Sequence, residues 1–367
     1  MTNPASAAPA RTAVRHVRVF DGRQLTEPRT VVINGSIISP DTSTAGAHTL
    51  DGTGLVLLPG LIDAHVHLHG PDTLARLASY GVTTALDMAT WPPQLLASLR
   101  QVTDLTDIRS AGTPAIGDGG PHSHIPGMAQ EAIVRSPQQA GEFVAAQVSA
   151  GADYIKIVAE APGQGGPEQE TIDALVAAAR THGRKTVAHA ATAGAYTMAL
   201  DAGVDFVTHI PIDRPLDPGD IARMAAAGQV CIPTLTVMQG TAAAGGAAPA
   251  YHTARRNLGA LHTAGVPILA GTDANLQPGV PFQVEHGVSL HHELELLVDA
   301  GLAPVEALHA ATALTARYFG LTDRGSVRPG LRADLLLVDA DPLADIRATR
   351  AIHRIWCAGI EQTPAVA

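Results

Sequence analysis

Cysteine is scarce in this chain of 367 residues, which contains only Cys231 and Cys357. Two cysteines cannot build a disulfide framework, and their scarcity suits a reducing compartment, so we expect a cytoplasmic protein. Basic residues are also few, since 24 Lys and Arg face 34 Asp and Glu and give a formal net charge of −10. This balance disfavours a nucleic-acid partner, because phosphate binding needs clustered Lys and Arg.

Long apolar runs are missing as well. No stretch of about 18 apolar residues is free of charges or turn residues, so we expect no membrane span. The first 17 residues contain no apolar run of signal-peptide length. Aromatic residues make up only 3% of the chain, but 46% of its residues are apolar, enough to bury a large core. Histidine, the commonest metal ligand, occurs 17 times.

The two ends of the chain share short β-prone runs that are separated by turn dipeptides. At the N-terminal end the runs span residues 14–20, 30–33 and 55–58, and turns such as Asp21-Gly22 and Asn34-Gly35 divide them. At the C-terminal end, residues 333–338 and 352–356 have the same character. We therefore predict one small β-sandwich domain built from residues 1–58 together with residues 321–367.

The middle of the chain, residues 59–320, alternates strand-like and helix-like patterns, which is typical of βα units around a parallel sheet. The sequence predicts an α/β fold in which this part forms a (β/α)8 TIM barrel. An open doubly wound sheet is the alternative, but no Gly-rich dinucleotide or phosphate loop follows an early strand. Helices are expected at residues 171–182, 220–227 and 252–263, among others. Strands are expected at residues 61–67, 82–88, 108–116, 154–158, 186–189, 206–209, 230–233 and 267–271.

Polar residues stand at the ends of several of these apolar runs, where the catalytic groups of a barrel are found. Each has an ordinary explanation when taken singly: a chance His-x-His pair, a lysine at the barrel rim, a core histidine or an aspartate that caps a helix. Residues i and i+2 of a strand share a face, so two of the histidines can reach one ion. The joint pattern predicts a metal site with ligands His65, His67, Lys156, His189, His209 and Asp273.

Two members of this set suggest more than simple ligation. A neutral lysine amine is a poor ligand, but Lys156 carboxylated by CO2 offers two oxygens that can bridge two metal ions. Asp273 follows the apolar run 268–272, and it can both ligate a metal and take a proton from bound water. Asp273 is therefore the predicted catalytic residue.

Five segments resemble those of the amidohydrolase superfamily. Residues 59–67, Pro-Gly-Leu-Ile-Asp-Ala-His-Val-His, are similar to its opening motif, and residues 151–157 are similar to the strand that carries its bridging lysine. The segments 203–209 and 271–274 also match, as does the tail from Gly301 to Pro342 with its Ala333-Asp334-Leu335. The resemblance covers nearly the whole chain and is strongest to the imidazolonepropionase-like branch, which includes metal-dependent dipeptidases and carboxypeptidases.

The resemblance implies a barrel with a composite β-sandwich and two divalent metal ions, usually zinc. It assigns His65, His67 and Asp273 to one ion, His189 and His209 to the other, and carboxylated Lys156 as the bridge between them. Two departures concern the substrate rather than the metals. Ala190-Ala191 follows His189 where relatives often carry His or Tyr two positions on, and Ile210-Pro211 follows His209 where glycine is frequent.

These observations predict hydrolysis of an amide-type C–N bond in a small molecule, such as a dipeptide, an N-acyl amino acid or a cyclic amide. A metal lowers the pKa of water to about 7, and the resulting hydroxide attacks the carbonyl. Lactone, ester or carbamate hydrolysis is an alternative, and so is a one-metal deaminase, although residues 190–195 lack the Glu that such enzymes usually use. A non-enzymatic scaffold is disfavoured because all six ligand positions are present.

Two segments are expected to influence the choice of substrate. Residues 117–127 contain His122 and His124, which either contact substrate or belong to a solvated Gly/Pro-rich loop. Residues 236–251 are rich in Ala and Gly and are expected to form a mobile lid. The sequence leaves open the substrate, the metal identity and whether the chain forms a homo-oligomer.

Overall fold

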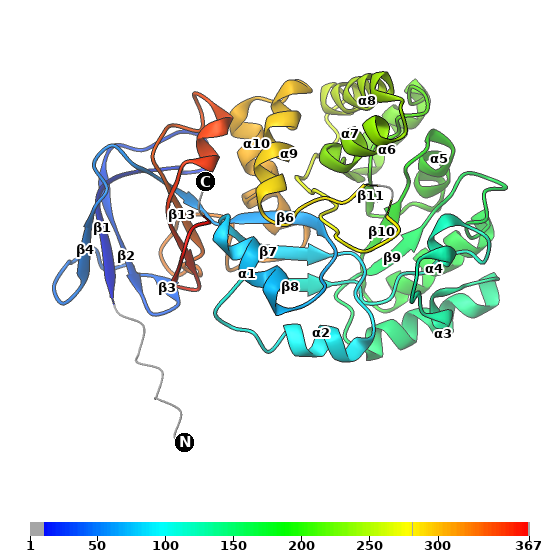
Figure 1. Ribbon diagram of the computed structural model, residues 1–367, viewed down its shortest axis with the longest axis horizontal. Coiled ribbons are helices and arrows are strands. Elements are labelled where there is room, and N and C mark those ends of the chain that lie inside the picture. The colour runs from blue at the N-terminus through cyan, green and yellow to red at the C-terminus, as the bar shows by residue number, and fades with distance from the viewer. Residues whose placement is uncertain (1–10, 281, 366–367) are drawn as a thin grey trace.

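The computed structural model describes residues 11–280 and 282–365. A β-rich part lies at the left of Figure 1 and an α/β part at the right. The β-rich part is an eight-stranded sheet in the order β15-β14-β13-β5-β1-β2-β3, with β4 paired to β1. Its strands are β1 (Thr12–Val19), β2 (Arg29–Asn34), β3 (Ile37–Ile38), β4 (His48–Asp51), β5 (Val56–Pro59), β13 (Leu335–Val338), β14 (Ile352–Cys357) and β15 (Ile360–Gln362).

Strand β5 joins the two ends of the chain within this sheet. It runs parallel to β1, with Leu57 opposite Val19, and antiparallel to β13, with Leu58 opposite Leu336. Inward-facing side chains from both ends, including that of Trp356, share one apolar core. The terminal strands expected from the sequence are therefore present. The structure also contains β3, β4 and β15, which the sequence did not predict. The domain division at residues 58/59 and 320/321 stays a prediction.

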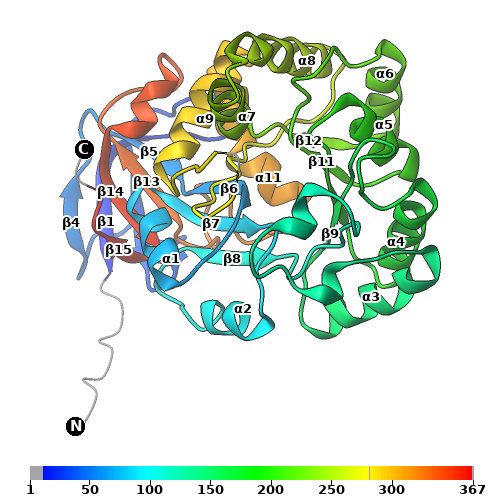
Figure 2. The same cartoon turned by 45° about the vertical axis from the view of Figure 1, so that its right-hand side comes forward.

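The α/β part contains two parallel sheets, seen in Figure 2 with helices around them. The first sheet is β6 (Leu61–Val66), β7 (Val82–Asp87) and β8 (Asp107–Ser110), and the second is β9 (Ile155–Val158), β10 (Thr186–His189), β11 (Phe206–Thr208) and β12 (Val230–Ile232). Single parallel bridges connect neighbouring segments: Ala115 with Ile157, Cys231 with Ile268, and Val66 with Ala274. The strand expected at 108–116 is thus shorter than predicted, and its last residues pair only through bridges.

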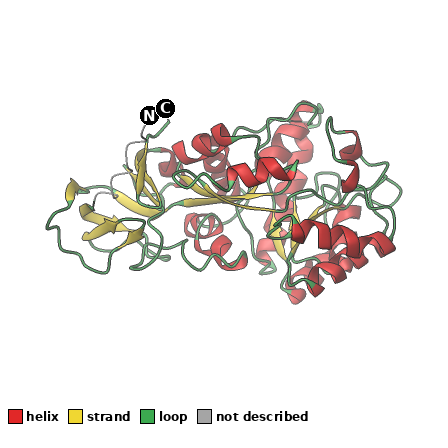
Figure 3. Cartoon of the chain, turned by 90° about the horizontal axis from the view of Figure 1, so that it is seen from below, coloured by secondary structure: helices red, strands yellow, loops and turns green. Residues whose placement is uncertain are grey.

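The helices lie mostly to the sides of these strands, as the view from below shows (Figure 3). They are α1 (Pro71–Ser79), α2 (Pro93–Leu99), α3 (Pro137–Ser149), α4 (Gln169–Thr181), α5 (Ala193–Ala202), α6 (Pro218–Ala227), α7 (Leu235–Ala244), α8 (Tyr251–Thr263), α9 (Val288–Asp299), α10 (Pro304–Ala310) and α11 (Ala313–Tyr318), with short 3-10 turns η1 (Pro121–His124), η2 (Gln130–Ala132), η3 (Ala248–Ala250) and η4 (Ile346–Arg350). Within the described residues, no helix combines the length and the apolar character that a membrane crossing requires.

Alternate residues of the parallel strands belong to two different apolar clusters. Val187 of β10 packs in a smaller cluster with Tyr154 and Phe206, whereas its neighbour Ala188 packs in the larger cluster that includes the helices. Because successive side chains of a strand point to opposite faces, the two clusters lie on opposite faces of the strands. Lys156 lies two residues after Tyr154, so this alternation directs its side chain to the same face as that of Tyr154.

Two expectations about this part are wrong. Residues 267–271 form no regular strand: Pro267 has no N–H to donate, and residues 268–270 make scattered backbone bonds, as from the Leu269 N–H to the Cys231 carbonyl. Residues 236–251 are mostly helix α7 and not a loop, because alanine favours helix and because the Glu293 carboxylate accepts the backbone N–H groups of Leu235 and Thr236 in the first turn.

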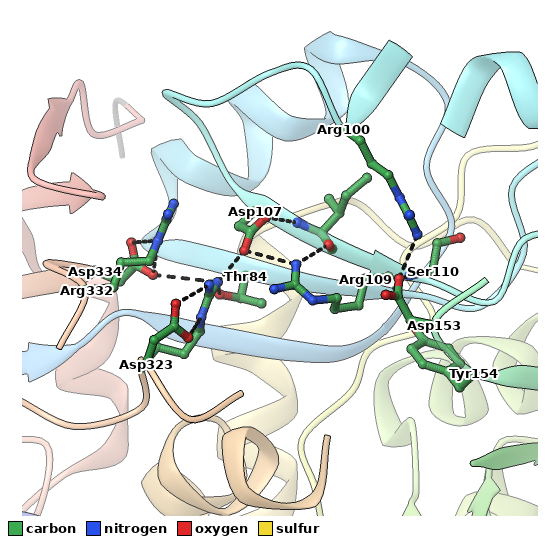
Figure 4. Close-up of polar contacts among 12 residues, drawn as sticks. Thr84, Arg100, Asp107, Arg109, Ser110, Asp153, Tyr154, Asp323, Arg332 and Asp334 are labelled. Atoms are coloured by element: carbon green, nitrogen blue, oxygen red, sulfur yellow. Dashed lines mark hydrogen bonds and ion pairs between the residues drawn. The ribbon is translucent and has the colours of Figure 1, made fainter. Parts of the chain in front are cut away.

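A cluster of ion pairs connects the β-rich part with the first parallel sheet (Figure 4). We call it the arginine cluster and define it as Arg324, Asp107, Asp323, Asp334 and Arg332. The Arg324 guanidinium is buried and lies 2.6 Å from Asp107, 2.9 Å from Asp323 and 3.9 Å from Asp334. Arg332 pairs with Asp334 at 2.8 Å. Each buried charge therefore has an opposite charge beside it.

Candidate metal centre

Asp273 and two histidines of β6 and its end make the most compact part of the site. The Nε2 atoms of His65 and His67 lie 3.2 Å and 3.0 Å from the same oxygen, Oδ1 of Asp273. Each of the three side chains offers a ligand atom within 4.8 Å of the others. Two imidazole nitrogens and a carboxylate oxygen at this spacing suit a divalent ion such as Zn2+.

The backbone around Asp273 is held against β6. The Asp273 N–H donates to the His65 carbonyl at 2.9 Å, and the His67 N–H donates to the Ala274 carbonyl. A Cβ at Gly271 would lie 2.9 Å from the His65 backbone nitrogen, so only glycine permits this close approach. Asp273 itself has a φ of 58°, a left-handed conformation that is rare for a non-glycine residue and common at functional sites.

His189 and His209 form the second part of the site. Their ring centroids lie 4.3 Å apart, and His209 lies 5.1 Å from His65. His189 ends β10, whereas His209 follows β11 with a φ of 75°. Both parts of the predicted site therefore meet at the carboxyl ends of the parallel strands.

Threonine hydroxyls hold the histidines in place. Nδ1 of His65 lies 2.5 Å from Oγ1 of Thr208, and Nδ1 of His209 lies 2.8 Å from Oγ1 of Thr234. A hydrogen bond at one ring nitrogen fixes the ring orientation and leaves the other nitrogen available to a metal.

Lys156 lines the same cavity as these two parts. It is only 4% exposed, and its Nζ has no hydrogen-bond partner among the residues that the structure describes. Burial lowers its pKa to about 7, although Asp273 and Asp87 oppose this shift. A buried amine without an acceptor is costly. The position therefore suits a lysine that engages a further group.

The protonation states also suit metal ligands. Burial lowers the pKa of His65 to about 3, and it lowers the pKa values of His189 and His209 well below the ordinary value. Burial raises the pKa of Asp273, but the charges and hydrogen bonds of His65 and His67 outweigh it and keep that pKa well below its ordinary value. Neutral imidazoles and an ionised carboxylate are the forms that bind metal.

Of the two histidines predicted to contact substrate, the structure brings only one to the site. His122 of η1 lines the same cavity as the ligand set, and its ring lies 4.6 Å from that of His189. Its Nδ1 is 3.3 Å from Oε1 of Glu160. His124 is exposed, does not line the cavity, and lies with Nδ1 3.1 Å from the Gly120 carbonyl.

A cavity of about 350 Å³ opens over these residues and is lined by all six predicted ligands. The donor set, its spacing and the unpartnered Lys156 amine fit a centre for divalent ions. Sequence inspection missed Glu160, Thr208 and Thr234. A charged residue four positions after Lys156 was a usable signal for Glu160, but no sequence pattern marks hydroxyl groups that bond histidines from another strand.

The fold and the site together define a metal-dependent hydrolase of the α/β class. The family model for the amidohydrolase family matches residues 56–361, and the chain belongs to this family. This confirms the family predicted from the motifs, and with it a hydrolase that acts on C–N bonds.

Several relatives support this assignment. An uncharacterized protein of Mycobacterium tuberculosis is 29% identical, with 91% of this chain and 88% of that protein covered. An imidazolonepropionase of Deinococcus deserti is 31% identical over half of this chain and 43% of its own length.

Solved structures show the same fold. A putative prolidase from Bifidobacterium longum has a TM-score of 0.81 and 27% identity, covering 98% of this chain and 97% of that chain. A Xaa-Pro dipeptidase with bound methionine has a TM-score of 0.82 at 23% identity, covering 96% and 99%.

Proposed function

We propose that this chain hydrolyses an amide-type C–N bond of a small molecule at a centre of two zinc ions. One observation carries the proposal: six residues singled out by their strand-end positions line one cavity. The candidate substrates are a dipeptide, an N-acyl amino acid and a cyclic amide. The likeness to a Bifidobacterium prolidase supports amide cleavage.

The proposed fold around this centre is a closed (β/α)8 barrel over residues 59–320, with a β-sandwich from residues 1–58 and 321–367. The bridges of Ala115, Cys231 and Val66 with their neighbours support a ring, because they join the two parallel sheets through extended segments. The alternation of the two apolar clusters supports an inner face enclosed by the strands.

Within this centre, His65, His67 and Asp273 would hold one ion, and His189 and His209 would hold the other. When bound, the ions would lower the pKa of a nearby water molecule and would place positive charge beside the substrate carbonyl. His122 faces the same space and can donate a hydrogen bond to the substrate.

Lys156 is proposed to be carboxylated and to bridge the two ion positions. An ammonium group at this depth would have to be desolvated beside two dications, which is unfavourable. Carboxylation reverses the sign of its charge and gives it two oxygens. The absence of a hydrogen-bond acceptor near Nζ in the described residues supports this change.

Asp273 is proposed to move the proton of the reaction. Its Oδ1 faces both His65 and His67, and its carboxylate is 19% exposed toward the cavity. It can accept a proton from the attacking water and deliver it to the leaving nitrogen.

Metal analysis of the purified protein tests the proposal. We expect two divalent ions per chain, loss of amide hydrolysis after chelation, and recovery when zinc is restored. One ion or fewer in active, unchelated protein would contradict the two-metal centre.

A further inference from the structure

The cavity wall above the candidate ligands is predominantly apolar. It is contributed by residues from separate segments: Trp91 after β7, Met128 after η1, Val237 and Met238 of α7, and Phe282 before α9. Phe282 lies directly against α7, since a Cβ at Gly240 would come within 2.2 Å of its ring. Such a wall favours apolar groups on both sides of a scissile bond.

Away from the proposed ion positions, the described residues of the same wall offer no arginine or lysine to pair with a negatively charged group of the substrate. Within residues 11–280 and 282–365, no arginine lines the cavity, and its lysine is Lys156 at the position proposed as a metal bridge. Recognition of a carboxylate usually uses an arginine or lysine that can pair with it.

Glu160 makes the wall still less suitable for an anion. Its carboxylate lines the cavity, is 11% exposed and lies 3.3 Å from His122 Nδ1. A substrate carboxylate in this part of the cavity would therefore approach the Glu160 carboxylate. Burying such a charge without a partner is strongly unfavourable.

The remaining polar groups of the wall are uncharged. Thr241 of α7, Asn275 and Gln277 provide hydroxyl and amide groups, which can bond a neutral amide as donors and acceptors. We infer that the substrate is an apolar amide that carries no carboxylate beside the scissile bond. This inference rests on the proposed function. Among the candidate substrates proposed there, it excludes dipeptides and N-acyl amino acids.

Three acetamides that differ at one carbon test the inference. They are N-acetylphenethylamine, N-acetylphenylalanine, which adds a carboxylate at that carbon, and the analogue with an aminomethyl group there. With the metal-loaded protein, we expect kcat/KM for the neutral compound to exceed that for the carboxylate compound by about tenfold or more, and the aminomethyl compound to lack this loss. Equal values for the neutral and carboxylate compounds, or a preference for the carboxylate compound, would overturn the inference.

A binding measurement separates this inference from the proposed hydrolysis. The matching methanesulfonamides are not hydrolysed, so calorimetry gives their dissociation constants without turnover. If no acetamide is cleaved but the neutral sulfonamide still binds more tightly than the carboxylate sulfonamide, the proposed hydrolysis fails and the inference stands. If the acetamides are cleaved equally well, the proposed function stands and the inference fails. Absence of binding by all three sulfonamides would also overturn the inference.

A cation placed in the wall should reduce the preference for the neutral compound over the carboxylate compound. Thr241→Arg is expected to tighten binding of the carboxylate sulfonamide by about tenfold relative to Thr241→Gln, which has similar length and no charge. Metal content should be the same in both variants. Equal binding of the carboxylate compound by the two variants would overturn the inference that a missing cation sets the selectivity.

Discussion

The arginine cluster and the candidate metal centre are both buried groups of charged residues, but they differ in how their charges are balanced. Arg324 is 6% exposed and has carboxylates of Asp107 and Asp323 within 3 Å. Lys156 is 4% exposed and has no hydrogen-bond partner among the described residues. A satisfied buried charge fixes the packing of elements, whereas an unsatisfied one marks a place where a further group can bind.

Lys156→Ala should have the largest effect, because it removes the group proposed to bridge both ions. We expect loss of metal and of activity, measured by elemental analysis and by amide hydrolysis. Formate or acetate supplied with zinc should restore part of both, since a short carboxylate can occupy the space left by the side chain. A plain amine at Lys156 in fully metallated, active protein, detected by mass analysis, would contradict carboxylation.

Asp273→Asn should have the next largest effect. We expect turnover to fall by about 10²- to 10⁴-fold, because the side-chain amide of Asn cannot accept the proton from water. Thermal unfolding and metal content measured on the same sample will show whether the fold and the ions are retained. Near-normal turnover in a folded, metal-loaded variant would remove Asp273 from its proposed role.

Arg324→Met and Lys156→Met form a matched pair that tests the comparison directly. In metal-free protein, Arg324→Met should lower the free energy of unfolding by about 1 to 3 kcal/mol, because it removes the charged hydrogen bonds to Asp107 and Asp323 and leaves buried Asp334 with Arg332 alone. Lys156→Met should lower it little or raise it, since the amine it removes is buried without a partner. Urea unfolding measures both free energies. Equal losses of stability in the two variants would show that Arg324 and Lys156 do not differ in how their buried charges are balanced.

The pH dependence of the Arg324→Met effect provides a control. Burial raises the pKa of Asp107, but Arg324 and Arg109 outweigh it and lower that pKa below its ordinary value of 3.8. A carboxyl whose pKa is lowered by folding contributes stability above the unfolded value and loses it as the pH falls. The difference between wild type and Arg324→Met should therefore shrink below pH 3.8.

Gly240→Ala should have the smallest effect, because it changes neither charged cluster. The added Cβ forces the Phe282 ring to move. We expect KM to change by up to on the order of tenfold while metal content stays the same. The exposed position Ala243, changed to Gly, controls for altered helix propensity in α7. An unchanged KM would show that Phe282 does not shape the substrate space.

Local patterns predicted most of the strands and the positions of the candidate ligands. The apolar residues around Lys156 predicted that it lies in a strand and which face of the strand its side chain occupies, because alternation within a strand is a local property. Residues 267–271 could not be predicted in the same way, since their bonds go to Cys231 and other distant residues. The helical state of residues 235–244 depends partly on Glu293, which lies beyond the next helix in the chain.

The arginine cluster also lay beyond sequence inspection. Arg324 and Asp107 are far apart in the chain, and neither belongs to a recognisable spacing pattern. They meet because the segment after α11 lies against the first residue of β8.

The pairing of β5 with β13 has a consequence for biosynthesis. Leu58 pairs with Leu336, so most of the chain must be translated before this edge of β5 finds its partner. Until then, the N-terminal strands leave the ribosome with an open apolar edge, which favours association with other chains. Nascent chains arrested before residue 335 should therefore depend on chaperones more than chains arrested after residue 357.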